Sequence, residues 1–150
     1  MGIATTTAGD IRAALVPLIE AMTPTYTEYQ DQAWCYIPDN DVGGPEIRTF
    51  TILNSPSQET PGGMHGGAGI EYDYELTIRV AYGGLKSLVA SDLIDEDGRD
   101  LWLLMHPLPD AGGIDGLLPF RNSYQVELYD DEPGSLIVDF VFETHYKGRD

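Results

Sequence analysis

The sequence predicts an α+β fold, with two main helices packed on one face of an antiparallel, or mixed, β-sheet and a long protruding strand or hairpin. Two segments carry apolar residues at helical spacing, and five segments show the alternation typical of strands. Because two helices are too few for a doubly wound parallel sheet, an antiparallel sheet with one covered face is the economical arrangement. The length of 150 residues, 42% of them hydrophobic, predicts one domain over residues 1–150.

Two segments have the spacing of a buried helix face. The first helix is expected over residues 10–22, with Ile11, Leu15, Leu18 and Met22 toward the core. Pro17 lies inside it and predicts a kink or a short first segment, because proline has no N–H to donate. The second helix is expected over residues 86–105, with Leu88, Leu93, Leu101, Leu104 and Met105 toward the core. Gly98 predicts a split there, because glycine costs about 1 kcal/mol relative to alanine in a helix.

Alternating apolar and polar residues predict five strands, over residues 25–37, 46–54, 70–82, 120–129 and 135–146. The last of them carries Leu136, Val138, Phe140 and Phe142 on one face. Residues 130–134, Asp-Asp-Glu-Pro-Gly, have the composition of a hairpin turn. Residues 55–69 contain five glycines and two prolines and are expected to form a mobile loop.

The segment 70–82 gives the clearest strand pattern of the chain, with apolar or aromatic residues at every even position. At ~3.3 Å per residue it would reach roughly 43 Å when fully extended. Strands in globular domains seldom exceed about 10 residues, so this one is expected to protrude beyond its own core. A long strand in a chain without a recognisable catalytic motif predicts a part that joins subunits rather than an enzyme.

The composition excludes several classes of protein. Twenty-five acidic residues against eight basic ones give a net charge of −17, which disfavours binding to phosphate backbones and anionic membranes. Cys35 is the single cysteine, so no intrachain disulfide can form, and it is expected to be a small buried residue in a strand. No apolar run approaches the ~18 residues of a membrane span, and no secretion signal is recognised, so synthesis inside the cell is expected.

No catalytic residue, cofactor or metal site is predicted. Grouped carboxylates suit hard cations, and the chain has such a group at Asp92, Asp95, Glu96, Asp97 and Asp100. Aligned as a calcium loop, however, this segment puts Leu93 and Leu104 where ligands are needed. The favoured interpretation is a solvated helix face, or an acidic start to a helix segment that complements the helix dipole. The glycine-rich residues 61–69 lack the lysine of a phosphate-binding loop. They are either a flexible connection or a loop that orders against a neighbouring subunit.

Other catalytic chemistry has no sequence signal. His65, His106 and His145 fall in separate predicted elements, so nothing brings them together as zinc ligands. No Gly-x-Ser-x-Gly motif marks a nucleophilic serine.

Three features of the chain carry a resemblance to a known family. The first helix begins Asp-Ile-Arg-Ala-Ala-Leu at residues 10–15, the long strand ends Thr-Ile-Arg-Val-Ala-Tyr at 77–82 before a helix, and the closing hairpin ends Val-Phe-Glu-Thr-His-Tyr at 141–146. In this arrangement the chain resembles the tail terminator and tail-completion proteins of long-tailed bacteriophages. The resemblance implies an α+β fold and a ring, commonly a hexamer, that caps the tail tube and stops its growth.

The resemblance also implies partners and a location. The expected partners are further copies of the chain, the tail tube protein and the head–tail connector or neck protein, while DNA passes through the channel without specific binding. The expected location is the head-proximal end of the virion tail, after synthesis in the host cytoplasm. Three other interpretations stay open: another neck or tail-tube component, an acidic binding or inhibitor module, and a metal-dependent hydrolase using the acids of residues 92–100.

Two sets of residues are expected to serve a ring. Tyrosine is enriched in contact surfaces, and a methionine flanked by glycines suits an adaptable contact. The expected interface residues are Met64, His65, Tyr72 and Tyr74. Acids facing the channel would repel DNA phosphates within a Debye length of ~8 Å. The expected channel-lining acids are Glu71, Asp73, Glu75, Glu127, Asp130, Asp131 and Glu132.

Overall fold

The computed structural model describes residues 8–24, 33–37, 47–53, 58–64, 70–83, 87–108, 120, 124–132 and 135–148. Within these ranges the elements are α1 (Ala8–Glu20), β1 (Cys35–Tyr36), β2 (Ile47–Ile52), β3 (Gln58–Met64), β4 (Ile70–Tyr82), α2 (Ser87–Met105), β5 (Gln125–Glu132) and β6 (Ser135–Gly148). The sheet has the order β1-β2-β4-β6-β5, and β3 pairs with β4 beside this path. The β1–β2 pair is parallel and the other pairs are antiparallel, so the sheet is mixed.

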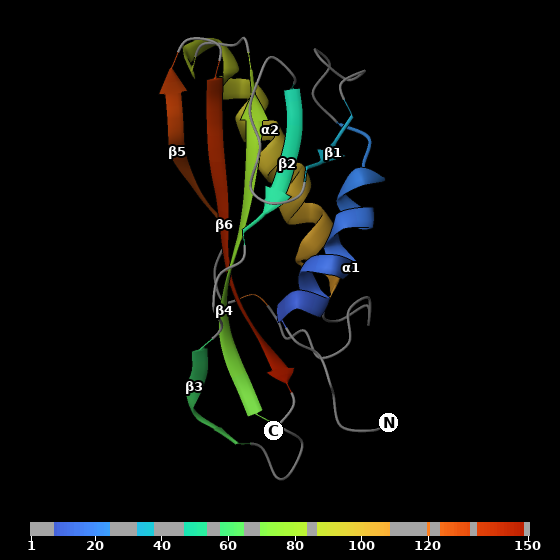
Figure 1. The fold of residues 1–150 in the computed structure, drawn as a ribbon, viewed down its shortest axis with the longest axis vertical. Helices are drawn as coiled ribbons and strands as arrows, with labels where there is room; N and C mark the ends of the chain where they lie inside the picture. Colours follow the sequence, from blue (N-terminus) through green and yellow to red (C-terminus); the bar gives the residue numbers. More distant parts are fainter. Residues whose placement is uncertain are drawn as a thin grey trace.

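The core lies between the two helices and one face of the sheet, here called the helix face. Side chains from α1, α2, β2, β4 and β6 form one buried cluster, which includes Ile11, Leu15, Ile19, Phe50, Leu76, Ile78, Val80, Leu93, Leu101, Val138 and Phe140. Figure 1 shows both helices on the same side of the strands. The predicted α+β class, with two helices on one face of a mixed sheet, is confirmed.

Helix α1 runs without a break through Pro17. Its fully buried face is Ile11, Leu15 and Ile19, whereas the predicted Leu18 is only partly buried. Proline has no N–H, so Pro17 cannot donate the usual helical hydrogen bond to the carbonyl of Ala13. Both residues are exposed, so water can reach that carbonyl instead. The predicted short first segment is wrong, because α1 is continuous over Ala8–Glu20, and the predicted kink stays a prediction.

Helix α2 is also continuous, and the split predicted at Gly98 is wrong. Gly98 is buried, and a Cβ atom there would lie 2.7 Å from the ring of Tyr124 and 2.9 Å from the ring of Phe140. The glycine thus serves close packing of the helix against aromatic rings rather than a break in the helix.

The predicted strand over residues 25–37 appears only as the two-residue β1, while residues 25–32 lie outside the described part of the chain. Cys35 is exposed, contrary to the prediction of a buried thiol, because the neighbouring Trp34 occupies the core position. Oε2 of Glu20 accepts a hydrogen bond from the backbone N–H of Tyr36 at 3.2 Å. Helix α1 therefore covers part of this edge of the sheet.

The predicted loop over residues 55–69 is wrong for residues 58–64, which form β3. Gln58 pairs with Asp73, Glu59 with Tyr72, and Met64 with Ile70, with a register shift between Glu59 and Met64. Pro61, Gly62 and Gly63 fall within that shift. Proline and glycine are tolerated on an edge strand and at bulges, where ladder hydrogen bonds are not required, so composition alone misjudged the segment.

Strand β4 has the bounds that the alternation predicts, Ile70–Tyr82. Residues 70–73 pair with β3 on one side and with residues 145–148 of β6 on the other, whereas residues 78–82 lie between β2 and β6. We call residues 58–64, 70–73 and 145–148 the ribbon. Figure 1 shows the ribbon extending past β2, β5 and the helices at one end of the molecule, as the length of the strand predicts.

Strands β5 and β6 form the predicted hairpin, but β5 is displaced relative to the predicted 120–129, whereas β6 begins where predicted and ends two residues later. Strand β5 reaches Glu132, so Asp130, Asp131 and Glu132 belong to the strand rather than to the turn. Glu132 pairs with Ser135, and a bulge lies between Leu128 and Asp130. The four predicted core residues of β6, Leu136, Val138, Phe140 and Phe142, are buried.

We predict that Gly98→Ala destabilises the protein. The added methyl group would lie within 3 Å of two aromatic rings, so the cost of overpacking falls in the upper part of its range, at about 2–3 kcal/mol, above the gain of about 1 kcal/mol in helix propensity. Urea unfolding should show a net loss of about 1 kcal/mol or more. Asp92→Ala, on the exposed face of the same helix, is the control and should change stability by less than about 0.5 kcal/mol. A variant of Gly98 as stable as the control would contradict the packing argument.

Candidate functional site

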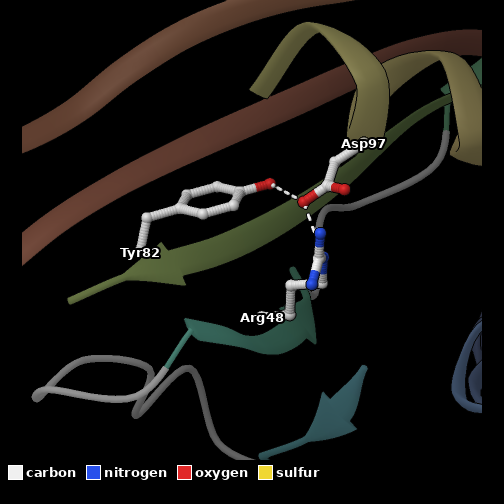
Figure 2. A network of polar contacts seen from close by, with 3 residues as sticks. All are labelled: Arg48, Tyr82 and Asp97. Atoms are coloured by element: carbon white, nitrogen blue, oxygen red, sulfur yellow. Dashed lines mark hydrogen bonds and ion pairs between the residues drawn. The ribbon is translucent and has the colours of Figure 1, made fainter. Parts of the chain in front are cut away.

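The most unusual polar group of the molecule is a buried contact among Arg48, Tyr82 and Asp97 (Figure 2). Nε of Arg48 and the hydroxyl of Tyr82 both donate to Oδ2 of Asp97, at 2.9 and 2.8 Å. All three residues are fully buried, with 0% exposure. The contact joins β2, β4 and α2, so it fixes the second helix on the sheet.

A local distortion of β2 accompanies this contact. Arg48 has a φ of 62°, in the left-handed region that non-glycine residues seldom adopt, and the register of β2 against β4 shifts between Ile47 and Thr49. Such a conformation costs of order 1–3 kcal/mol and persists only where surrounding contacts hold it. The ion pair with Asp97 supplies one such contact.

The interpretation of residues 92–100 as a solvated acidic face is wrong for Asp97. Asp92 and Asp95 are exposed, but Asp97 is buried. The sequence held a signal, because Asp97 stands four residues after Leu93 and four before Leu101, and both leucines are buried. A single acid at a core position of a helix indicates a buried partner of opposite charge.

Burial is the largest influence on the pKa values of the two acidic groups, the Asp97 carboxyl and the Tyr82 phenol. Burial raises the pKa of the Asp97 carboxyl, while the hydrogen bond and charge of Arg48 pull it down. Oδ1 of Asp97 has no hydrogen-bond partner in the part of the chain that the structure describes, which adds to the cost of the charge. Burial and the charge of Asp97 raise the pKa of Tyr82 well above its ordinary value. The phenol therefore stays protonated, and its hydroxyl donates a hydrogen bond to Asp97. Because all three groups lie out of reach of a substrate, their role is structural.

A second ion pair lies on the opposite, outer face of the sheet. Nε and Nη2 of Arg79 donate to Oδ1 and Oδ2 of Asp139 at 2.8 and 3.0 Å. The guanidinium carbon also lies 3.5 Å from the ring centroid of Tyr129, a cation–π contact. The hydrogen bond to Asp139 raises the pKa of Arg79 above its ordinary value. This group ties β5 to β6 and β4 on the outer face.

The register places most of the predicted channel-lining acids on one face. In an antiparallel sheet, residues directly opposite each other share a face, and successive residues alternate. Arg79 is paired with Asp139, and Asp139 with Glu127, so Glu71, Asp73, Glu75 and Glu127 all stand at outer-face positions. Beyond the bulge, Asp130 and Glu132 take outer-face positions as well, whereas Asp131 takes a helix-face position opposite Leu136.

Only part of this outer face is exposed. Glu75 and Glu127 are exposed, and so is Glu143, which stands directly opposite Glu75. Like charges placed opposite each other disfavour pairing, so the exposed carboxylates are not explained by sheet stability. Thr77, Ile137 and Val141 are buried on the same face. The acids that remain for a channel wall therefore lie in the ribbon, beside it at residues 75 and 143, and in β5.

The predicted interface residues are dispersed. Tyr74 is a core residue, 2% exposed, and its hydroxyl accepts a hydrogen bond from Nη1 of Arg12 at 3.3 Å, so it offers almost no surface to a neighbouring subunit. Tyr72 stands in the ribbon opposite Glu59 and Tyr146, and Met64 stands opposite Ile70. His65 lies outside the described residues.

Strand β5 presents a surface that the sequence did not reveal. It stands at the end of the sheet, and its residues 125–129 are all exposed. Val126, Leu128 and Tyr129 are three of the large hydrophobic side chains exposed in the described part of the chain. An edge strand with exposed apolar side chains is a place where another chain can dock.

A cleft lies at the other side of the molecule, between α1 and the β1–β2 pair. Its volume is about 210 Å³, and it is lined by Gly9, Arg12, Ala13, Val16, Tyr36 and Ile52. The lining is about as polar as it is apolar, and Arg12 is its cation.

In the described ranges, no three histidine, cysteine or acidic side chains are close enough to hold a metal ion. His106 stacks on Trp102 at 5.3 Å between ring centroids, and His145 lies in the ribbon. Neither described helix is both long and apolar enough to cross a bilayer.

No protein-family model matches the sequence, and no curated protein matches it. The function is therefore argued from the geometry of this chain.

We predict that Arg48→Met destabilises the protein by about 3 kcal/mol at neutral pH, because it leaves the Asp97 carboxylate buried without its counter-charge. Without Arg48, the hydrogen bond and the charge that pull the pKa of Asp97 down are lost, so burial raises the folded-state pKa further against the one remaining hydrogen bond, from Tyr82. A carboxyl with a raised folded-state pKa binds its proton more tightly when folded, so stability falls as the pH rises through that pKa. Urea unfolding at about pH 5 and pH 7 should therefore show the larger loss at pH 7.

The double variant Arg48→Met, Asp97→Leu is the matched control, since it removes both charges and should recover most of the loss. A loss in Arg48→Met that does not depend on pH, or a double variant no more stable than the single one, would contradict the buried ion pair.

Proposed function

We propose that this protein is a structural virion subunit that forms a ring on the end of a phage tail tube. The ring ends polymerisation of the tube and offers the surface to which the head joins. The observation that carries the proposal is the ribbon, which extends past the helix-covered core at one end of the molecule (Figure 1). A strand that runs beyond its own core gains most from that length when a neighbouring molecule packs against it.

The distribution of charge supports the same function. The acids Glu71, Asp73 and Glu75 stand on one face of the sheet, with Glu127 on the same face. A channel wall with carboxylates repels DNA phosphates at short range, so DNA slides past instead of binding. The proposed partners are further copies of the chain, the tail tube protein and the head–tail connector or neck protein.

The burial of polar groups also supports a structural role. The buried hydrogen bonds among Arg48, Tyr82 and Asp97 hold α2 to the sheet. The protein is proposed to have neither catalytic residues nor a cofactor.

One alternative has an observation of its own. Exposed carboxylates at Glu75, Glu127 and Glu143, in a chain of net charge −17, would also suit an acidic module that binds a basic protein. That alternative predicts a stable monomer that forms a complex with the basic partner. A ring subunit predicts self-association.

We predict that the purified protein, mixed with polymerising tail tube protein, forms rings on the tube ends and shortens the tubes. Native mass spectrometry would give the number of copies, and negative-stain electron microscopy would show the rings and the tube lengths. Adding the protein at the start of polymerisation gives the test, and adding it after polymerisation is complete gives the control. Unchanged tube lengths, with the protein monomeric throughout, would sink the proposal.

We also predict that reversing the charge of the outer-face acids makes the ring bind DNA. The variant Glu71→Lys, Asp73→Lys, Glu75→Lys places cations at the proposed channel wall, and cations that neutralise phosphates bind DNA with strong salt dependence. Duplex binding at low salt should rise by about tenfold or more, and infectivity should fall. The control Asp92→Lys, Asp95→Lys, Glu96→Lys makes the same charge change on α2. Equal behaviour of the two variants would remove these acids from the channel.

A further inference from the structure

Strand β5 is a free edge of the sheet, at the end opposite β1 (Figure 1). In the described ranges, no strand pairs with β5 on the side away from β6. Residues 125–129 of this strand are all exposed. The outer backbone groups of an edge strand are a template on which an extended segment of another protein can be added as a further strand.

Two apolar rows of the helix face end at this edge. Residues directly opposite each other in neighbouring strands contact through their side chains, so the register defines rows that cross the sheet. One row is Ile52, Ile78, Phe140 and Val126, and the other is Phe50, Val80, Val138 and Leu128. All members are buried except the last of each row, Val126 at 45% and Leu128 at 58% exposure. The next position outward in either row favours an apolar side chain, which would cover the one now exposed.

A charged row of the outer face lies between these two and ends at Glu127. It consists of Thr51, Arg79, Asp139 and Glu127. The cation of the row is engaged, because Arg79 donates to both carboxylate oxygens of Asp139 at 2.8 and 3.0 Å. Glu127 adds a second carboxylate and is exposed. The position outward of Glu127 favours lysine or arginine, because opposite charges on paired strands attract and like charges oppose pairing.

The sheet already contains this combination of side chains once. Strand β6 presents Asp139 between the apolar Val138 and Phe140, and β4 pairs with these three residues through Arg79, between two apolar neighbours. Strand β5 presents the same alternation at its free edge, with Glu127 between Val126 and Leu128. The segment that fits this edge is therefore extended and carries arginine or lysine between two apolar residues.

A second copy of the chain does not offer such a segment. In the sequence, a lysine or arginine flanked on both sides by apolar residues occurs only at residues 11–13 and 78–80. Residues 11–13 belong to helix α1, and residues 78–80 are already paired with β2 on one side and β6 on the other. The net charge of −17 also opposes pairing of β5 with another acidic copy. The complementary segment thus belongs to a different protein.

We propose that the β5 edge binds an extended segment of a different protein, which joins the sheet as a further strand and places lysine or arginine, between two apolar residues, beside Glu127. The inference concerns β5 alone and goes beyond the ring function without depending on it.

Two synthetic peptides test the proposal. Acetyl-Gly-Thr-Ile-Arg-Val-Thr-Gly-amide carries the expected triplet, and the matched control has glutamate in place of the arginine. In an NMR titration of the isotope-labelled full chain at low salt, the arginine peptide should shift the amide signals of residues 125–129. It should bind about fivefold or more tightly than the glutamate peptide, because the exchange removes an attractive pair and adds a repulsive one.

Variants of β5 separate this contact from the general attraction of a cation to an acidic protein. Glu127→Arg should reverse the preference, so that the glutamate peptide binds more tightly than the arginine peptide. Asp92→Arg makes the same charge change on the exposed face of α2 and should leave the preference as it is. Leu128→Ser should weaken binding of both peptides, because it removes the apolar end of one row.

The outcomes decide between an edge that binds and an edge that is only protected. Amide shifts at β5, with a preference that Glu127→Arg reverses, support the proposal. Failure of both peptides to bind at millimolar concentration means that the charge merely protects the edge, and it overturns the proposal. A preference that survives Glu127→Arg is general attraction and overturns it as well. Either failure leaves the ring function standing, because rings on tail tubes are scored in a separate experiment.

Discussion

The length of strand β4 is the constraint on which the rest of the structure depends. Its 13 residues exceed what one small core can cover, so the strand is used in two different ways along its length. Residues 78–82 lie between β2 and β6 under the helices, while residues 70–73 lie between β3 and the end of β6 in the ribbon. The same alternation that buries Ile78 and Val80 therefore leaves acids at the outer face, where Glu75 is exposed.

The helix that follows β4 is fixed by charge as well as by apolar packing. The buried Arg48, Tyr82 and Asp97 join α2 to two strands through hydrogen bonds to one carboxylate oxygen. A buried ion pair of this kind adds little net stability compared with apolar side chains, but it is sensitive to loss of either partner. Its effect here is to define where α2 lies, and Gly98 on the same helix allows Tyr124 and Phe140 to approach closely.

The spacing of apolar residues along the sequence predicted the helices and strands that have one apolar and one polar face. The bounds of β4, and nearly those of α2 and β2, follow from the sequence because one side of each is buried by its own chain. Composition failed at β3, where an edge strand tolerates Pro61 and the glycines after it. It failed at Asp97, because the spacing from the buried leucines marks a core position but does not identify the partner, Arg48, 49 positions away in the sequence. The exposure of Leu128 could not be predicted either, since it depends on the order of the strands in the sheet.

We propose that the ribbon and the β5 edge are contact surfaces between molecules. Hydrogen–deuterium exchange, compared between the isolated protein and the protein on tail tubes, measures this residue by residue. The account predicts that amides of residues 58–64, 70–73 and 125–132 gain protection on assembly, while those of α2 and residues 78–82 of β4 keep the protection they already have. Equal exchange of the ribbon and β5 in the two states would contradict it.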